Sequence, residues 1–349
     1  MRFASAIGAF WQRAPLLTFV AMSAITGNGR PTHGPRTFTY PYPRIALLEP
    51  SPPDGPDPYG NADPEPAWMR IDWRSHVGTI ELGADRVNYA EIGDGPAIIF
   101  IHGLGGCWQN WLETMPRMAE LGHRAIALDL PGFGASPMPT ETISIPGYGE
   151  LIDRFRTALA VGRCTLVGNS MGGLIAAEVA TGEPAWLEDL MLVSAAGISH
   201  AEMRREPATL AARMMTVAKP LMRFLDMPSV RRPGLRELAV GGVARHPLRL
   251  RPELLAQQLL NGFDAPGFVA ATSALVGYDL RERLRRIGVP TLIVWGRNDR
   301  VVPATDGAGY AAKITGSRLV VFDDCGHVPM LERPLRFNRL LAELSAAAP

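Results

Sequence analysis

The stretch that decides the fold is TLVGNSMGGLIAAEVAT, residues 165–181. Its first three residues are apolar and typical of a buried strand, and its second half has the pattern of a helix. Between them stands Gly168-Asn169-Ser170-Met171-Gly172, the one GxSxG pattern in the sequence. Glycines on both sides of a serine allow a sharp backbone turn. The stretch therefore predicts a strand, a tight turn that carries Ser170, and a helix.

Similar apolar runs lie on both sides of this stretch, at residues 97–101, 125–128, 190–193, 291–295 and 319–322. Continuous apolar runs fit strands that are buried on both faces, as in a parallel sheet. Helical patterns separate most of them, around residues 110–121 and 147–161. This alternation predicts a doubly wound α/β sheet. Two further short strands, at 76–82 and 86–92, are predicted to form a hairpin in front of it.

A long segment without a clear strand interrupts the alternation between residues 193 and 291. We interpret it as a helical cap over residues 199–279, inserted into an α/β core formed by residues 75–198 and 280–349. Residues 201–252 carry eleven Arg and Lys against four Asp and Glu, a net charge of +7. A basic cap can attract an anionic substrate or an anionic membrane surface, and a solvated helical surface is the alternative.

Residues 1–74 form an N-terminal apolar segment followed by a proline-rich arm. The uncharged run at 14–29 is shorter than the roughly 20 residues that span a bilayer. We expect an amphipathic helix docked on the protein or on a membrane surface, and leave a secretory signal or disorder open. Residues 31–66 hold 11 of the 31 prolines. Because proline removes a backbone donor, this part is predicted to be extended.

Composition excludes several classes of protein. The chain has 349 residues, 47% of them hydrophobic and 20% charged, which rules out a wholly disordered chain, a coiled coil and a multi-pass membrane protein. The net charge of +1 gives no sign of a nucleic-acid partner. Cys107, Cys164 and Cys325 have neither disulfide nor zinc-ligand spacing, so we expect free thiols and no metal. A cytoplasmic location is favoured, with secretion or membrane association left open, and oligomeric state is not predicted.

Three residues at predicted strand ends suggest nucleophilic chemistry. A serine nucleophile requires a base, and the base requires an acid that orients it. His327 follows the last predicted strand, and Asp299 follows the strand before it. A serine nucleophile on a strand–turn–helix is followed along the chain first by its acid and then by its histidine, and Ser170, Asp299 and His327 stand in this order. Asp323 and Asp324 are the alternatives to Asp299, but they are too close in sequence to reach behind the imidazole ring easily.

Acyl transfer to Ser170 also needs donors for an oxyanion. The backbone amide of Met171 lies just after the serine, and the amide of Leu104 lies in the loop after the strand at 97–101; fixed donors of this kind contribute about 3 kcal/mol each. Trp108, Asn169 and Val328 are predicted to line the substrate pocket, with core packing as the alternative for Trp108. His102 is interpreted as a structural residue of its loop.

Five stretches in this order resemble the α/β-hydrolase superfamily: HGLGG at 102–106, DLPGFGAS at 129–136, GNSMGG at 168–173, PTLIVWGRNDRVVP at 290–303 and CGHVPMLERP at 325–334. The resemblance covers about residues 75–345. It implies a mostly parallel eight-stranded sheet, a cap after the sixth strand, and a Ser-His-Asp triad that needs no cofactor. Members with a serine nucleophile include esterases, lipases and hydrolases of carbon–carbon bonds in ring-fission products. The serine departs from the Asp nucleophile of epoxide hydrolases and haloalkane dehalogenases.

Three functions follow from these patterns. The favoured one is hydrolysis of a small-molecule carboxylic ester with an apolar acyl group. The second is carbon–carbon hydrolysis of a dienoic ring-cleavage product, because GNSMGG and WGRNDRVVP are most similar to that branch. Its usual longer Gly-rich loop after the His-Gly pair is missing, however, and Val328 stands where it usually has an aromatic residue. The third is a non-catalytic binding protein on the same fold. Peripheral membrane contact, through the N-terminal segment or the basic cap, is left open for all three.

Overall fold

The computed structural model of the protein describes residues 48–60, 63–206, 209, 232–262 and 265–346. The predicted N-terminal apolar segment, residues 1–30, lies outside this part of the chain. So does much of the predicted cap, between Glu206 and Arg232.

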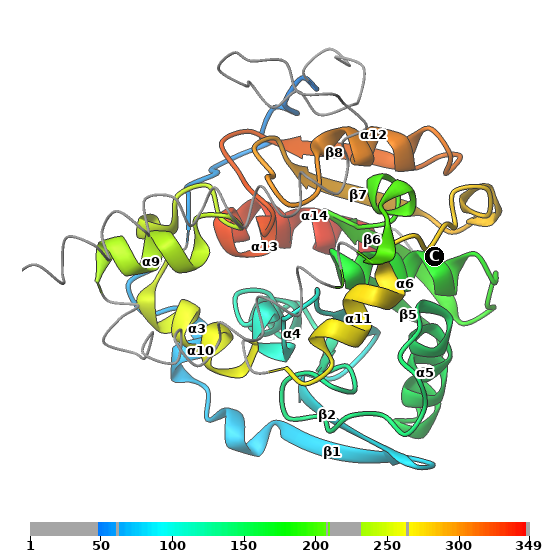
Figure 1. Cartoon of the computed structure of the whole chain (residues 1–349). Coiled ribbons are helices and arrows are strands. Elements are labelled where there is room, and N and C mark those ends of the chain that lie inside the picture. The colour runs from blue at the N-terminus through cyan, green and yellow to red at the C-terminus, as the bar shows by residue number, and fades with distance from the viewer. Residues whose placement is uncertain (1–47, 61–62, 207–208, 210–231, 263–264, 347–349) are drawn as a thin grey trace, which may run out of the picture.

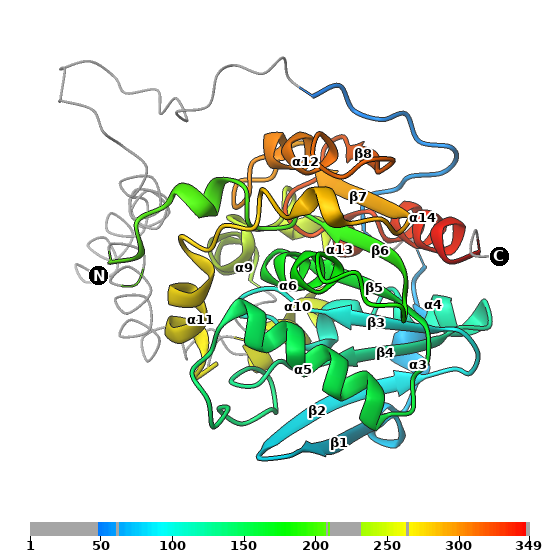
Figure 2. The same ribbon diagram turned by 90° about the vertical axis from the view of Figure 1, so that its right-hand side faces the viewer.

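An eight-stranded sheet forms the centre of the molecule (Figures 1 and 2). Its strands are β1 Val77–Leu82, β2 Asp85–Ile92, β3 Ala97–Ile101, β4 Arg124–Leu128, β5 Cys164–Asn169, β6 Leu187–Val193, β7 Thr291–Gly296 and β8 Arg318–Phe322. They lie in the order β1-β2-β4-β3-β5-β6-β7-β8. β1 and β2 pair antiparallel, β2 pairs antiparallel with β4, and all pairs from β4 to β8 are parallel. The predicted doubly wound, mostly parallel sheet is confirmed.

Helices cover both faces of this sheet. The α-helices are α3 Ala67–Arg70, α4 Met115–Glu120, α5 Ile145–Ala158, α6 Met171–Ala180, α9 Pro233–Val240, α10 Pro252–Gly262, α11 Phe268–Leu275, α12 Ala304–Ala311, α13 Pro329–Glu332 and α14 Pro334–Ala346. Short 3₁₀ helices are η1 Trp73–Ser75, η2 Trp108–Trp111, η3 Ser199–Glu202, η4 Pro247–Arg249 and η5 Leu284–Arg286. The expected helix at 110–121 is divided into η2 and α4. Pro116 accounts for the start of α4, because proline fits the first turn of a helix but not its interior.

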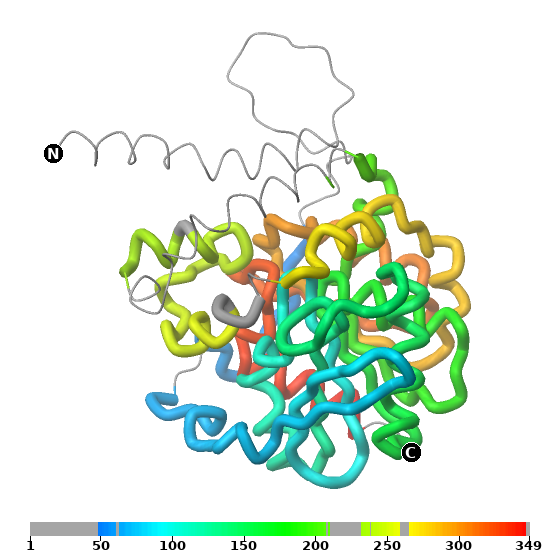
Figure 3. The backbone as a smooth tube through the Cα atoms, turned by 60° about the horizontal axis from the view of Figure 1, so that its bottom comes forward, coloured from blue at the N-terminus to red at the C-terminus, as the bar shows by residue number. Residues whose placement is uncertain are grey.

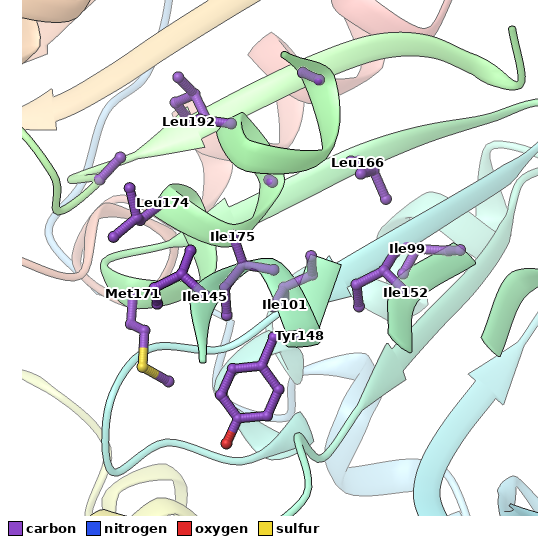
Figure 4. Close-up of a cluster of buried hydrophobic side chains, with 14 of the residues drawn as sticks. Ile99, Ile101, Ile145, Tyr148, Ile152, Leu166, Met171, Leu174, Ile175 and Leu192 are labelled. Atoms are coloured by element: carbon purple, nitrogen blue, oxygen red, sulfur yellow. The ribbon is translucent and has the colours of Figure 1, made fainter. Parts of the chain in front are cut away.

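Alternate residues of the central strands enter two separate cores. Ile99 and Ile101 of β3 pack on the face covered by α5 and α6, whereas Ile98 and Phe100 pack on the opposite face, with α4 and α14. This follows from the period of two along a strand. Figure 4 shows the first core, where Met171, Leu174 and Ile175 of α6 meet Ile145, Tyr148 and Ile152 of α5 above the strands. Both faces are apolar, which explains why the central strands read as unbroken apolar runs.

The segment between β6 and β7, which we call the insertion, carries helices and no strand among its described residues: η3, α9, η4, α10, α11 and η5. It contacts loops that follow strands of the core. The amide of Gly267 donates to the carbonyl of Gly132, at 2.9 Å, in the loop after β4. The amide of His327 in the loop after β8 donates to the carbonyl of Val243, at 2.8 Å. Contact of the insertion with a membrane surface stays a prediction. No helix among the described residues is both long and apolar enough to cross a bilayer.

Residues 48–60 of the arm have no regular secondary structure and run along the edge of the sheet, whereas its other described part, residues 63–74, contains the short helix α3 and the start of η1. The amide of Ser51 donates to the carbonyl of Val321 in edge strand β8, at 2.9 Å, and the hydroxyl of Ser51 accepts from the amide of Val321, at 3.1 Å. Arg336 of α14 donates to the carbonyl of Ser51. Figures 2 and 3 show the arm, in blue, beside the red C-terminal helices. The arm therefore covers a strand edge that would otherwise expose unpaired backbone groups.

Candidate active site

The residues singled out from the sequence lie in loops at one edge of the sheet. Ser170 follows β5, Asp299 follows β7, and His327 follows β8. The loop at 102–106, which contains Leu104, follows β3. Because these four strands are parallel, their carboxyl ends share an edge, and this is where ligands bind in open α/β sheets.

Ser170 stands at a strained turn between β5 and α6. Its backbone has φ 57° and ψ −117°, a conformation that residues with side chains rarely adopt. Two neighbouring glycines permit the turn. A Cβ on Gly168 would lie 2.2 Å from the carbonyl oxygen of Gly172, and a Cβ on Gly172 would lie 2.2 Å from the carbonyl oxygen of Ile101. Any larger residue at either position would therefore force the backbone apart.

His327 and Asp299 contact each other directly. Nδ1 of His327 lies 2.8 Å from Oδ2 of Asp299, whose side chain is completely buried. The other carboxylate oxygen of Asp299 accepts hydrogen bonds from the amides of Val301 and Val302, at 2.8 and 2.9 Å. This arrangement holds Nδ1 as a donor, which leaves Nε2 of the neutral ring as an acceptor.

Asn169 joins the serine turn to the histidine loop. Its side-chain amide donates to the carbonyl of Val193, at 3.1 Å, and to the carbonyl of His327, at 3.2 Å. The backbone of His327 is thus bound to the residue that precedes Ser170. The loop after β3 approaches the same point, since a Cβ on Gly103 would lie 3.0 Å from Cβ of Ser170. Asn169, predicted as a pocket residue, is 3% exposed and uses its amide within the protein.

The two predicted oxyanion donors lie on either side of this contact. Met171 is the first residue of α6, so its amide has no carbonyl one turn earlier to bind. Leu104 directly follows Gly103 and packs its side chain against the core that contains α6. Their distance from a bound oxyanion, and hence their role, stays a prediction.

His102 shapes the loop that carries Leu104. Its Nδ1 donates to the carbonyl of Gly103, at 2.7 Å, and its Nε2 accepts from the amide of Leu130, at 3.0 Å. The ring is fully buried, and burial lowers the pKa of His102 from 6.5 to about 4. The histidine is therefore neutral and structural, as its place in the sequence predicted.

Asp129, in the stretch 129–136, joins its own loop to η2 and to strand β2. It accepts hydrogen bonds from the amide of Trp108, at 2.7 Å, from the amide of Ala135, at 2.9 Å, and from the side chain of Asn88, at 2.8 Å. Burial raises the pKa of Asp129 from 3.8 to about 6, against the opposing effect of these bonds. A Cβ on Gly134 would lie 2.2 Å from the carboxylate, so the glycine makes room for the acid.

The remaining pocket predictions are placed less simply. Trp108 is 6% exposed, and its ring packs against the ring of Trp73, with centroids 5.1 Å apart. The contacts of Trp108 are thus those of a core residue, which was the alternative interpretation, and a contact with substrate stays a prediction. Val328 is 5% exposed and directly follows His327, with its amide 3.3 Å from Oε1 of Glu332.

The alternative acids are engaged elsewhere. Oδ1 of Asp324 lies 2.7 Å from Nε2 of His246 in the insertion, and Asp323 pairs with Arg297 at 3.4 Å. The contact of Asp299 with His327 thus agrees with the choice made from sequence.

Sequence reasoning assigned no role to three buried residues around the site: Glu332, Tyr59 and His200. Glu332 lies within the quoted stretch 325–334, where an acid among apolar residues and prolines was a usable signal. No local pattern singles out Tyr59 in the arm. Burial, and next the nearby His327, lower the pKa of His200 from 6.5 to about 4. His200 is therefore a neutral ring within electrostatic reach of the His327–Asp299 pair.

The cysteines are free thiols. Cys107, Cys164 and Cys325 are all buried and unpaired. Within the part of the chain that the structure describes, no three His, Cys, Asp or Glu side chains gather in a way that could hold a metal ion.

Comparison with known proteins agrees with this arrangement. Residues 98–340 match the model of the alpha/beta hydrolase family. That range includes the serine turn, the aspartate, the histidine and the whole insertion. The chain belongs to the α/β-hydrolase family.

Several enzymes in this family are similar to the chain. A 2-hydroxy-6-oxo-6-phenylhexa-2,4-dienoate hydrolase of Comamonas testosteroni is 32% identical over 73% of this chain and 89% of its own length. A pimeloyl-[acyl-carrier protein] methyl ester esterase of Aeromonas hydrophila subsp. hydrophila is 30% identical over 73% of this chain and 97% of its own. The crystal structure of a membrane phospholipase A, 27% identical, superposes with a TM-score of 0.59 over 78% of this chain and 86% of its own. The three are named as a hydrolase, an esterase and a phospholipase, and the chain is a hydrolytic enzyme of the same family.

Proposed function

We propose that the protein hydrolyses a carboxylic ester with an apolar acyl group through a covalent acyl-enzyme on Ser170. The observation that carries the proposal is the 2.8 Å contact between His327 and the fully buried Asp299. It lies at the same edge of the sheet as a serine on a strained, glycine-flanked turn. This is the combination of nucleophile, base and orienting acid that acyl transfer requires.

The reaction begins when Oγ of Ser170 attacks the ester carbonyl and its proton passes to Nε2 of His327. Asp299 keeps Nδ1 of the ring protonated and stabilises the imidazolium that forms. The amides of Met171 and Leu104 donate to the oxyanion of the tetrahedral intermediate. Collapse of the intermediate breaks the carbon–oxygen bond, and the alcohol leaves with the proton from His327. Water then repeats the sequence on the acyl-enzyme and releases the acid.

An apolar acyl group fits the side chains that adjoin the reacting residues. Leu104 lies in the predicted donor loop, Val328 directly follows the histidine, and neither brings a charge to the site. In this proposal the insertion serves as a cap, since it contacts the loops after β4 and β8. The names of the methyl ester esterase and the phospholipase support ester cleavage.

Substitution of Ser170 by Ala tests the proposal. We expect kcat for p-nitrophenyl esters to fall by about 10⁶, the loss typical of a missing serine nucleophile. Esters of increasing acyl chain length, measured on the wild type, define the acyl specificity. A fluorophosphonate probe should label the wild type at Ser170 and leave the Ser170→Ala variant unlabelled. Retention of most of the activity by the variant would remove Ser170 from the mechanism, and an unlabelled, inactive wild type would favour a binding protein.

Carbon–carbon hydrolysis is the second candidate, because the dienoate hydrolase of Comamonas testosteroni shares 32% of its aligned residues with this chain. A panel that contains chromogenic dienoates beside simple esters separates the two. Turnover of dienoates with no measurable ester hydrolysis would reverse our order of preference.

A further inference from the structure

A buried carboxylate lies directly behind the loop that carries His327. Glu332 has no exposed surface. Its oxygens accept the amide of Gly326, at 2.9 Å, and the amide of Val328, at 3.3 Å. Gly326 and Val328 are the two neighbours of His327, so one side chain holds the backbone on both sides of the histidine. Glu332 lies on α13, only four residues after Val328 along the chain.

The insertion is bound to the same point. The amide of Arg245 donates to Oε2 of Glu332, at 2.9 Å, and the amide of His327 itself donates to the carbonyl of Val243, at 2.8 Å. Gly326 makes the approach possible, because a Cβ there would lie 2.6 Å from that carbonyl oxygen of Val243. The histidine loop is therefore held between α13 and the insertion.

The arm completes the arrangement through Tyr59. Its hydroxyl donates to Oε2 of Glu332, at 2.6 Å, and accepts from the amide of His246 in the insertion, at 2.8 Å. The ring is 8% exposed and packs against the guanidinium groups of Arg249 and Arg333, at 4.8 and 5.0 Å. One hydroxyl thus joins the arm, the insertion and the acid behind the histidine, from a position 273 residues away in sequence from Glu332.

The surroundings of the Tyr59 hydroxyl favour its protonated form, which is the form that donates to Glu332. Burial and the adjoining Glu332 raise the pKa of Tyr59, so the phenol stays protonated at neutral pH and can donate to Glu332. Burial also raises the pKa of Glu332, while the hydrogen bonds from Tyr59 and from three backbone amides lower it. Removing any donor leaves a buried acceptor less satisfied and the loop less restrained.

We propose that Tyr59 is a positioning residue for His327, and that the arm is thereby part of the machinery that sets the reactivity of the site. The inference rests on the proposed function, in which His327 is the general base. It assigns the arm a role beyond covering the edge of the sheet. Misplacement of a reacting group by about 1 Å can cost up to 10²-fold in rate, so the restraint on this loop should appear in kcat.

The test is Tyr59→Phe, which removes the hydroxyl and keeps the ring. We expect kcat, expressed per active site titrated with the fluorophosphonate, to fall by about tenfold, with KM changed less than about twofold. Counting titrated sites removes any unfolded fraction from the comparison. The matched control is Tyr278→Phe, which also removes a hydroxyl that donates to a carboxylate, that of Glu178 at 2.8 Å, at the far end of α6. It should retain the wild-type kcat.

A double-mutant cycle with Glu332→Gln separates positioning from a general loss of packing. If Tyr59 acts through Glu332, Tyr59→Phe should change kcat by less than about twofold in the Glu332→Gln background. Unchanged kcat per titrated site in Tyr59→Phe, an equal loss in Tyr278→Phe, or additive losses in the cycle would each overturn the inference. Failure of the proposed function looks different, because the wild type would then be neither labelled nor active on esters.

Discussion

The serine turn and the histidine loop lie at the same edge of the sheet but are built in different ways. The turn at Ser170 is encoded locally: a strand, two glycines and a helix within residues 165–181 give it its shape. The loop at His327 is held by groups from distant parts of the chain. These are Tyr59 of the arm, Val243 and Arg245 of the insertion, and Asn169 beside the serine.

The serine turn and the histidine loop should respond differently to substitutions. A turn that depends on close backbone contacts fails when a single atom is added. A loop that depends on several hydrogen bonds from separate segments loses its position gradually as partners are removed.

Asp299→Asn should have the largest effect, because it removes the carboxylate that binds Nδ1 of His327. The amide can hold the wrong tautomer of His327 and cannot stabilise the imidazolium, so we expect kcat to fall by about 10⁴ with the fold retained. Steady-state kinetics and circular dichroism measure the two. Asp323→Asn is the control, since that exposed acid contacts Arg297 and should leave kcat unchanged. An equal loss in both variants would contradict the assignment of Asp299.

Gly172→Ala should disrupt the turn at Ser170. The added Cβ would meet the carbonyl oxygen of Ile101 at 2.2 Å, a backbone atom that cannot move aside cheaply. We expect the free energy of unfolding to fall by about 3 kcal/mol, measured by urea denaturation. The control is Gly162→Ala, where a Cβ would meet nothing within 4 Å. A variant as stable as the control would show that the turn can relax.

A pH-dependent effect is expected at His102, beside the serine turn. Its folded pKa of about 4 lies below the reference value of 6.5, so the folded state binds fewer protons than the unfolded state between these values. The stability that neutral His102 contributes is therefore complete above pH 6.5 and is lost as the pH falls toward 4. We expect the wild type to lose about 3 kcal/mol more than His102→Gln when the pH is lowered from 7 to 4. Parallel pH profiles of the free energy of unfolding would contradict this.

Much of the fold was predictable because its signals are local. Apolar runs marked the buried strands, and the start of β6 at Leu187 rather than residue 190 is a difference of boundary only. The division of the expected helix at 110–121 is another local matter, set by Pro116. The positions of Ser170, Asp299 and His327 followed from their places at strand ends, since parallel strands bring such residues to one edge.

What could not be predicted are contacts between segments with no sequence pattern in common. Trp108 reads as a pocket residue near the donor loop, yet its ring packs on Trp73. Asn169 reads as a pocket residue, which stays a prediction, and its amide binds backbone carbonyls that no sequence pattern indicated. Tyr59 carries no signal at all, because its meaning depends on where a proline-rich arm crosses the molecule.

The sequence by itself determined the strands, the serine turn and the order of the reacting residues, because hydrophobic period and glycine placement act over a few residues. The folded chain alone reveals that the insertion holds the amide of the histidine and that the arm closes a buried hydrogen-bond cluster at Glu332. The physical reason is that buried donors and acceptors must find partners wherever the fold provides them, regardless of distance along the chain.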